Sequence, residues 1–260
     1  MGMKIAIAQI DIAFGAPDKN KIHVQEWLKK ASEQGAELVV LPELWTTGYD
    51  LTRIDEISDL GGENSIKFLK KLVAEHQIHI IGGSIPEKTK NGVKNTMITI
   101  NNQGELVKKY SKLHLFKLMD EHHYLLPGEE DGLFTLNDTQ MAGLICYDIR
   151  FPEWIRKHVI NGARVIFVVA EWPLARVDHW RTLLKARAIE NQCFVIACNR
   201  VGADLNNEFA GHSLIIDPWG DILAEGSEHE ELIHAEIDFT EVEKVRKKIP
   251  IFQDRRPSFY

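Results

Sequence analysis

The sequence has few cysteines, and they do not form the patterns that hold metals or disulfide frameworks. Its 260 residues include Cys146, Cys193 and Cys198. An odd number of cysteines in a chain of this length argues against the disulfide scaffold of small secreted proteins. Because no Cys-x-x-Cys pair occurs, a structural zinc site is not expected either.

Long hydrophobic runs and an excess of basic charge are also missing. Val165–Ala170 is among the longest apolar runs, whereas a membrane-spanning helix needs about 20 such residues. The N-terminal segment contains Gln9 and Asp11 and is too polar for a signal peptide. With 31 basic and 38 acidic residues the net charge is −7, which gives no indication of a nucleic-acid or membrane partner. We expect a soluble, cytoplasmic protein.

Glycine-rich phosphate-binding patterns, internal repeats and low-complexity linkers do not occur, which removes the sequence support for nucleotide binding. What the chain does contain is 44% hydrophobic residues, enough for one large domain or two small ones. Short runs rich in Val and Ile predict strands that are covered on both faces. These runs are Met3–Ile10, Glu37–Leu41, Ile78–Ile85, Thr96–Ile100, Met141–Ile145, Arg164–Ala170, Cys193–Cys198, His212–Ile216 and Leu232–Ile237.

Apolar residues at helical spacing lie between several of these strands. They predict helices around Val24–Ala31, ending near Gly35, around Ile66–His76, over Pro152–Asn161, and around Val177–Ala188. Asn64 and Ser65 are candidate caps of the second helix. The alternation of strands and helices predicts an α/β fold in which helices pack on sheets.

Three polar residues directly follow predicted strands. Glu43 follows "ELVVLP", Cys146 follows "MAGLI", and Glu171 follows "VIFVVA", while Lys112 comes shortly after "ELVKKY". Open α/β folds build their sites at the carboxyl ends of strands. Cys146 also precedes the predicted helix at Pro152, and a helix N-terminus favours the thiolate form of cysteine. Each residue also has a plainer interpretation, as a buried small thiol or as a solvated surface charge.

Three segments together resemble a known family. "LPELWTTGYD", "YSKLHLF" and "GLICYDIRFPEW" are similar, in order and spacing, to the signature segments of the nitrilase superfamily of carbon–nitrogen hydrolases. The similarity continues to "GHSLIIDPWG" and so covers nearly the whole chain. It implies a four-layer α-β-β-α sandwich that forms a homodimer, with residues 1–260 as a single domain and a C-terminal tail from about residue 241.

The resemblance also implies a catalytic set of Glu43, Lys112 and Cys146, with Glu121 of "MDEHHYLLPG" as a second glutamate. Cys146 is then the nucleophile, Glu43 moves the proton, and Lys112 with the backbone N–H of Tyr147 stabilises the oxyanion. Neither a metal nor another cofactor is needed.

Other residues near these motifs are candidate pocket residues. Tyr49, Phe116 and Trp172 fit either pocket walls or core positions. Arg150 is a candidate to pair with an acid and brace the cysteine turn, or to bind a substrate carboxylate. Glu171 could either line the pocket or brace it.

Three segments, "LPELWTTGYD", "HLFKLMDEHHYLLPG" and "AEWPLARVDHW", resemble small bacterial amidases related to omega-amidase. This resemblance implies hydrolysis of 2-oxo acid amides such as 2-oxoglutaramate and a place in methionine salvage. The alternative is an amidase or carbamoylase for another small acid amide, and a true nitrilase fits less well. The partner is in either case a small amide.

Three rival interpretations start from other residues. A Cys–His hydrolase would use one of four histidines as base: His114, His122, His123 or His212. A metalloenzyme would use Asp120–His123, although adjacent histidines on a regular element are expected to point in different directions. A non-enzymatic binding protein on the same scaffold would have lost one of the three implied catalytic residues, and all three are present.

Overall fold

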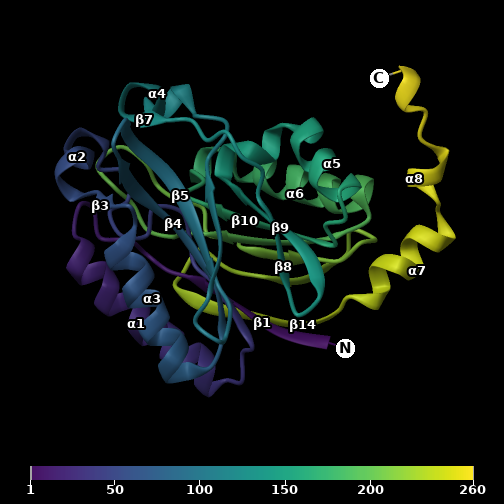
Figure 1. Ribbon diagram of the computed structural model, residues 1–260, viewed down its shortest axis with the longest axis horizontal. Coiled ribbons are helices and arrows are strands. Elements are labelled where there is room, and N and C mark those ends of the chain that lie inside the picture. Colours follow the sequence, from purple (N-terminus) through teal and green to yellow (C-terminus); the bar gives the residue numbers. More distant parts are fainter. Residues whose placement is uncertain (1, 260) are drawn as a thin grey trace.

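The computed structural model describes residues 2–259, which form two β-sheets packed face to face between two layers of helices (Figure 1). The helices α1 and α3 cover the outer face of one sheet, and α5 and α6 cover the outer face of the other. This is the predicted α-β-β-α sandwich. The helices of the described chain are α1 (Pro17–Glu33), α2 (Ile54–Ile57), α3 (Glu63–His76), α4 (Glu121–Tyr124), α5 (Pro152–Ile160), α6 (Val177–Asn191), α7 (Thr240–Lys248) and α8 (Ile251–Asp254).

The first sheet has the strand order β14-β1-β2-β4-β5-β6, with β3 beside β4 and β7 beside β5. Its centre, β1, β2 and β4, is parallel, whereas β14, β5 and β6 pair with their neighbours antiparallel. The strands are β1 (Gly2–Gln9), β2 (Leu38–Val40), β3 (Asp59–Leu60), β4 (His79–Thr89), β5 (Gly92–Ile100), β6 (Leu106–Ser111), β7 (Leu125–Leu126) and β14 (Glu231–Asp238).

The second sheet has the order β13-β12-β11-β10-β9-β8. The middle strands β9, β10 and β11 are parallel, and the outer strands are antiparallel. Every residue of β10 is buried, because the other sheet covers one face and helices cover the other. The strands are β8 (Leu133–Leu136), β9 (Thr139–Ile145), β10 (Val165–Ala170), β11 (Phe194–Asn199), β12 (Leu214–Ile216) and β13 (Ile222–Glu225).

Helix α1 shows why these segments fold as they do. Proline at its first position needs no backbone donor, and Val24, Leu28 and Ala31 form a buried stripe at helical spacing. The chain leaves the helix through Gly35, whose φ of 81° lies in the left-handed region that glycine adopts at low cost. Burying one such aliphatic side chain contributes about 1.5–3 kcal/mol, so the stripe fixes the helix on the sheet.

The expected caps of α3 were wrong. Asn64 and Ser65 lie inside the helix, and the cap position is Gly62. The carboxylate of Asp59 accepts the backbone N–H groups of Asn64 and Ser65, at 3.2 and 2.7 Å. An acid from the preceding strand therefore satisfies the free donors of the first turn.

The parallel strands of the second sheet end together at one edge. The register aligns Val169 with Ile145, and Ala170 with Asn199, so the residues that follow β9, β10 and β11 leave the sheet side by side. This confirms the expected placement of Cys146 and Glu171 at strand ends.

The charged segment after residue 240 is helical rather than an irregular tail. Val242 and Val245 of α7 are buried, and Arg246 donates to the carbonyls of Gln192 and Ala163, both at 3.3 Å. Beyond it, the chain runs along the side of the molecule to the C-terminus (Figure 1). Phe252 packs partly against the main core, and Gln192 Nε2 donates to the Ile249 carbonyl at 2.8 Å. Within residues 2–259, no helix combines the length and the apolar character needed to cross a membrane.

Candidate active site

Three charged residues from distant parts of the chain meet in the interior. The Lys112 Nζ lies 2.8 Å from Glu43 Oε1 and 2.5 Å from Glu121 Oε1, and all three side chains are fully buried. Glu43 follows β2, Lys112 follows β6, and Glu121 begins α4. The structure thus brings together three of the four residues that the resemblance implies as catalytic.

Neighbouring donors hold the Glu43 carboxylate in place. Asn95 Nδ2 donates to Glu43 Oε1 at 2.8 Å, and the backbone N–H of Glu171 donates to Glu43 Oε2 at 2.9 Å. Tyr49 Oη lies 3.0 Å from Glu43 Oε1. Buried charged groups require such partners, since an unpaired acceptor costs about 1–3 kcal/mol.

Glu121 is fixed in the same way. The Tyr49 hydroxyl donates to Glu121 Oε1 at 2.6 Å, and the backbone N–H of Phe116 donates to Glu121 Oε2 at 2.7 Å. Tyr49, expected as a pocket wall or core residue, therefore belongs to the charged network. Burial raises the pKa of Tyr49 well above its usual value, and the nearby carboxylates add to this, so the hydroxyl keeps its proton and acts as a donor.

The charges in this cluster shift one another's pKa. Burial by itself lowers the pKa of Lys112, but the negative charges of Glu121 and Glu43 outweigh burial, and the pKa is raised well above its usual value. Burial raises the pKa of Glu121, Lys112 lowers it in part, and Glu43 raises it again. Lys112 is therefore a fixed cation, and Glu121 holds a proton more tightly than an exposed glutamate.

Cys146 lies at the turn between β9 and a short 3₁₀ helix, Cys146–Arg150. Its φ of 43° is in the left-handed region, which costs a non-glycine residue about 1–3 kcal/mol. Burial raises the pKa of its thiol well above the usual range, and so does the charge of Glu43. Lys112 opposes this shift.

The expectation that a helix N-terminus holds Cys146 as a thiolate was therefore wrong. The α-helix begins only at Pro152, and burial beside a carboxylate favours the protonated thiol. A proton acceptor must act before Cys146 can attack a substrate, and the Glu43 carboxylate is close enough to raise the pKa of the thiol.

A narrow pocket leads to Cys146. It encloses about 230 Å³ of empty space, part of it open to solvent. Predicted site residues that line it are Phe116, Cys146, Tyr147, Arg150, Glu171 and Trp172, and they are joined by Arg176. The rings of Phe116 and Tyr147 contact each other, with centroids 4.6 Å apart. The pocket is tight, and its lining combines aromatic side chains with the charged residues Arg150, Glu171 and Arg176.

Glu171 both lines this pocket and braces it, so the two expected roles are not alternatives. Its Oε2 accepts a hydrogen bond from Arg200 Nη1 at 2.7 Å. Arg200 is fully buried and reaches on to Asp11 Oδ1, also at 2.7 Å. Burial raises the pKa of Glu171 to about 8, although Arg200 lowers it in part. The result is a second buried charge cluster beside the first.

The expectation that Arg150 pairs with an acid was wrong. Among residues 2–259, no carboxylate lies within 4 Å of Arg150. Its guanidinium stacks over the Trp172 ring at 4.7 Å, and Nη2 lies 3.3 Å from His179 Nδ1. Burial lowers the pKa of Arg150, and Arg176 adds to this, whereas Tyr147 and Cys146 oppose it.

The histidines proposed as alternative bases have other partners. His114 Nδ1 lies 2.8 Å from Asp148 Oδ1, and His212 Nδ1 lies 3.1 Å from Glu225 Oε1. The rings of His122 and His123 stack on each other, 3.8 Å apart. None of the hydrogen bonds of these four residues in the described chain goes to Cys146, which leaves the Cys–His interpretation without structural support.

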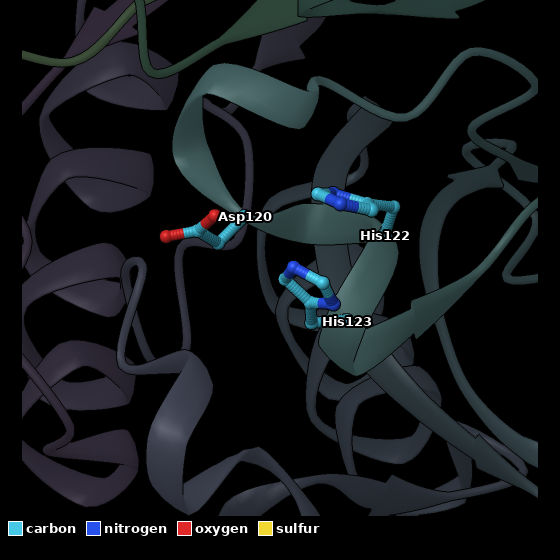
Figure 2. A group of neighbouring side chains, drawn as sticks. All are labelled: Asp120, His122 and His123. Atoms are coloured by element: carbon cyan, nitrogen blue, oxygen red, sulfur yellow. The ribbon is translucent and has the colours of Figure 1, made fainter.

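The expectation that the adjacent histidines diverge was also wrong. Asp120, His122 and His123 cluster at α4, and their ligating atoms all lie within 4.8 Å of one another (Figure 2). All three side chains are exposed, whereas Glu121 between them is buried. The group is thus one that could hold a metal ion at the surface, outside the residues that line the Cys146 pocket.

Sequence reasoning missed Asn95, Arg176 and Arg200. Arg200 had a signal, because it lies two residues after the predicted strand Cys193–Cys198 and directly after the observed strand β11. Arg176 lies three residues after Pro173 in "AEWPLARVDHW", and Asn95 lies between Lys94 and Thr96 at the start of a predicted strand. Neither residue type nor spacing singles out these two.

Comparison with known proteins agrees with this site. Residues 4–247 match the family model described as carbon–nitrogen hydrolase. The chain is 52% identical to the 2-oxoglutaramate amidase of Bacillus subtilis, over the full length of both chains. It is 33% identical to omega-amidase YafV of Escherichia coli K12, covering 97% of this chain and 96% of that one.

Solved structures give the same result. A CN-hydrolase superfamily protein of Xanthomonas campestris, with an arsenic adduct in its active site, is 31% identical and superposes with a TM-score of 0.92, covering 98% of each chain. A cysteine-to-alanine mutant of the amidase from a Nesterenkonia species, in complex with butyramide, is 25% identical, with a TM-score of 0.87 over 99% of this chain and 95% of that one. This chain therefore belongs to the carbon–nitrogen hydrolase family, within the nitrilase superfamily, and is an enzyme of that class.

Proposed function

We propose that the enzyme is an omega-amidase, which releases ammonia from 2-oxoglutaramate or a closely similar 2-oxo acid amide, with Cys146 as nucleophile. The observation that carries the mechanism is the buried Lys112 ammonium, held between Glu43 and Glu121 beside the protonated Cys146 thiol. The substrate class rests on the names of relatives that match over nearly their whole length.

The first half of the reaction forms a thioester. Glu43 accepts the thiol proton while the Cys146 sulfur bonds to the amide carbon. The resulting oxyanion is stabilised by the Lys112 ammonium and by the backbone N–H of Tyr147, which lies in the first turn of the 3₁₀ helix, where N–H groups lack helical partners. The carbon–nitrogen bond then breaks, Glu43 returns the proton to nitrogen, and ammonia leaves.

The second half of the reaction frees the enzyme. Glu43 accepts a proton from water, which attacks the thioester carbon, and the carbon–sulfur bond breaks as the thiol regains a proton. Losing one oxyanion donor typically costs about 2.7–4 kcal/mol of transition-state stabilisation. Glu121 touches Lys112 and holds its orientation, and no step requires a metal or another cofactor.

Two arginines give the pocket an affinity for an acidic substrate. Arg150 and Arg176 both line it, stacked over Trp172 and Phe116. In the described part of the chain neither has a carboxylate within 4 Å. Two guanidinium groups without a counter-ion favour an anion between them. We therefore assign them to the carboxylate at the end of the substrate remote from the amide.

We further propose that the protein is a homodimer. Apolar side chains are exposed on α5, on α6 and near the C-terminus, among them Ile160, Ile189 and Phe259, and a second copy would cover such a surface. Sedimentation of the full chain and of a chain cut after Lys248 tests the part played by the C-terminal segment. A single domain and a place in methionine salvage stay predictions from the resemblance, and cytoplasmic location stays a prediction from composition.

The test is ammonia release from a panel of 2-oxoglutaramate, 2-oxosuccinamate, glutamine, N-carbamoyl amino acids and simple nitriles. Wild type should turn over the 2-oxo amides best, and Cys146→Ala should turn over none. Turnover that persists in Cys146→Ala would contradict the mechanism. Preference for a carbamoyl compound would favour the alternative, a carbamoylase.

The arginine assignment has its own readout. Arg150→Met and Arg176→Met should each raise KM for 2-oxoglutaramate about tenfold or more, but leave turnover of the uncharged butyramide nearly unchanged. Arg181→Met is the matched control, because Arg181 pairs with Glu225 outside this pocket. Equal losses on both substrates would show that the arginines do not bind the carboxylate.

A further inference from the structure

Asp148 lies two residues after Cys146, and its carboxylate has four hydrogen-bond partners, as many as that of Glu43. Asp148 is fully buried. Its Oδ2 accepts the Tyr110 hydroxyl at 2.7 Å and the Ile145 backbone N–H at 3.1 Å. Its Oδ1 accepts the His114 backbone N–H at 3.1 Å and lies 2.8 Å from His114 Nδ1. One carboxylate therefore satisfies four polar groups, and all four face it.

The positions of these groups in the chain show which two segments of the site Asp148 connects. Ile145 directly precedes Cys146, whereas Tyr110 and His114 stand two residues before and two residues after Lys112. Asp148 thus ties the backbone that carries the thiol to the backbone that carries the ammonium. These two segments belong to different sheets, β9 and β6, and pack across the interior.

The same network reaches the helix behind the cysteine turn. Trp154 Nε1 of α5 donates to the Tyr110 hydroxyl at 3.1 Å. The His114 ring stacks on Phe151, with centroids 3.7 Å apart and planes 9° from parallel. Both partners of Asp148 are thereby immobilised, so the carboxylate is held against a rigid frame.

The turn that Asp148 supports is strained. Cys146 has a φ of 43°, a conformation that persists only where the surrounding structure enforces it. The hydrogen bond from Ile145 N–H to Asp148 closes this turn from the residue before the cysteine to the residue two after it. A side chain with fewer acceptor sites would leave one side of the turn unsupported.

We propose that Asp148 is a positioning residue, which sets the place of the Cys146 thiol relative to Lys112 and so the fit of the oxyanion. This inference rests on the proposed function. Asp148 does not line the pocket and acts through the groups that it holds. A misplacement of reacting groups by about 1 Å can cost about 100-fold in rate.

Asp148→Asn is the decisive variant. Asparagine offers one acceptor oxygen, and its amide NH₂ must face donors on one side. We expect kcat for 2-oxoglutaramate to fall about 100-fold while KM changes less than threefold. The rate at which iodoacetamide alkylates Cys146 should also differ from that of wild type. Asp59→Asn is the matched control, since Asp59 accepts backbone N–H groups at α3, and its kcat should stay within twofold.

Smaller changes keep the test informative if Asp148→Asn folds poorly. Tyr110→Phe and His114→Ala each remove one donor and should lower kcat about three- to tenfold at nearly constant KM. Rates are measured per folded molecule, by circular dichroism of the same samples. A kcat within threefold of wild type in folded Asp148→Asn, or unchanged kcat in both smaller variants, would overturn the proposal.

Failure of this inference differs from failure of the mechanism. If Cys146→Ala is inactive while Asp148→Asn is normal, only the positioning role is lost. If Cys146→Ala stays active, the proposed function itself fails. If Asp148→Asn loses stability but keeps kcat, Asp148 supports the fold alone and the proposal is wrong.

Discussion

Two charge clusters lie side by side in this enzyme, one fully buried and one that reaches the surface at Asp11, and they differ in the cation at their centre. The lysine cluster comprises Glu43, Lys112 and Glu121, and the arginine cluster comprises Asp11, Glu171 and Arg200. They touch where the backbone N–H of Glu171 donates to Glu43. Each places one cation between two acids, yet only one of them surrounds the proposed nucleophile.

The arginine cluster is fixed by geometry. Arg200 donates to Glu171, to Asp11 and to the carbonyl of Ile12, and its guanidinium stacks over Phe209 at 4.2 Å. Asp11 is about half exposed, at 49%. A planar guanidinium that stays charged at every relevant pH is suited to holding neighbouring chain segments in fixed positions.

The lysine cluster is shielded from solvent and carries more acidic than basic groups. Its three side chains are fully buried, and its two carboxylates exceed the one ammonium in number. Lys112 is close enough to Cys146 to lower the pKa of its thiol, against the larger opposing effect of burial. An ammonium is a compact charge that can serve an oxyanion as it forms. These differences support the proposal that the lysine cluster acts in catalysis and the arginine cluster supports the fold.

Lys112→Met should break the lysine cluster with the largest effect. We expect kcat to fall more than 1000-fold, because an oxyanion donor is lost and Glu43 and Glu121 are left facing each other. Breaking a buried pair costs about 3–5 kcal/mol, so the free energy of unfolding should fall as well. Ammonia release and urea unfolding measure the two losses. Lys112→Arg keeps the charge and should recover stability more than activity.

Arg200→Met should separate stability from catalysis. Removing the guanidinium leaves the buried Glu171 carboxyl without its hydrogen-bond donor, and we expect a loss of about 1–3 kcal/mol in the free energy of unfolding, with kcat of the folded enzyme within tenfold of wild type. Urea unfolding and ammonia release again measure both, and Arg181→Met, at an exposed pair, should cost less than about 1 kcal/mol. A kcat as low as that of Lys112→Met would contradict the division of roles.

Parts of the fold and of the lysine cluster could be predicted from the sequence, and other parts could not. The strands, the main helices and the residues at strand ends follow from hydrophobic runs and spacing, because burial on both faces leaves a local pattern. Glu43, Lys112 and Glu121 were predicted from motif resemblance, and their meeting in space agrees with it. The thiol pKa was misjudged, because desolvation of Cys146 depends on what covers it and not on the residues beside it.

Long-range partners left no local pattern. Arg150 was expected to have an acid partner, and only the packed structure shows that it stacks on Trp172 instead. Asp148 accepts donors from residues 34 and 38 positions away, which no spacing rule connects. The charged C-terminal segment forms the amphipathic helix α7, which the sequence analysis did not predict. Only Val242 and Val245 are buried along this helix, so its apolar pattern is weak.

Glu171→Gln tests the arginine cluster through the pH dependence of stability, and we expect its effect to be the smallest of the three variants. Burial raises the pKa of Glu171 from 4.5 to about 8 in the folded enzyme. Between these values the folded protein holds a proton that the unfolded chain has released, so this residue's contribution to stability is full below about pH 4.5 and is lost as pH rises through 8. Glutamine cannot ionise. Relative to wild type, the variant should therefore gain stability from pH 5 to pH 8.5, as followed by urea unfolding at several pH values. A difference that stays constant across this range would mean that Glu171 is ionised throughout, and that the arginine cluster is a permanent ion pair.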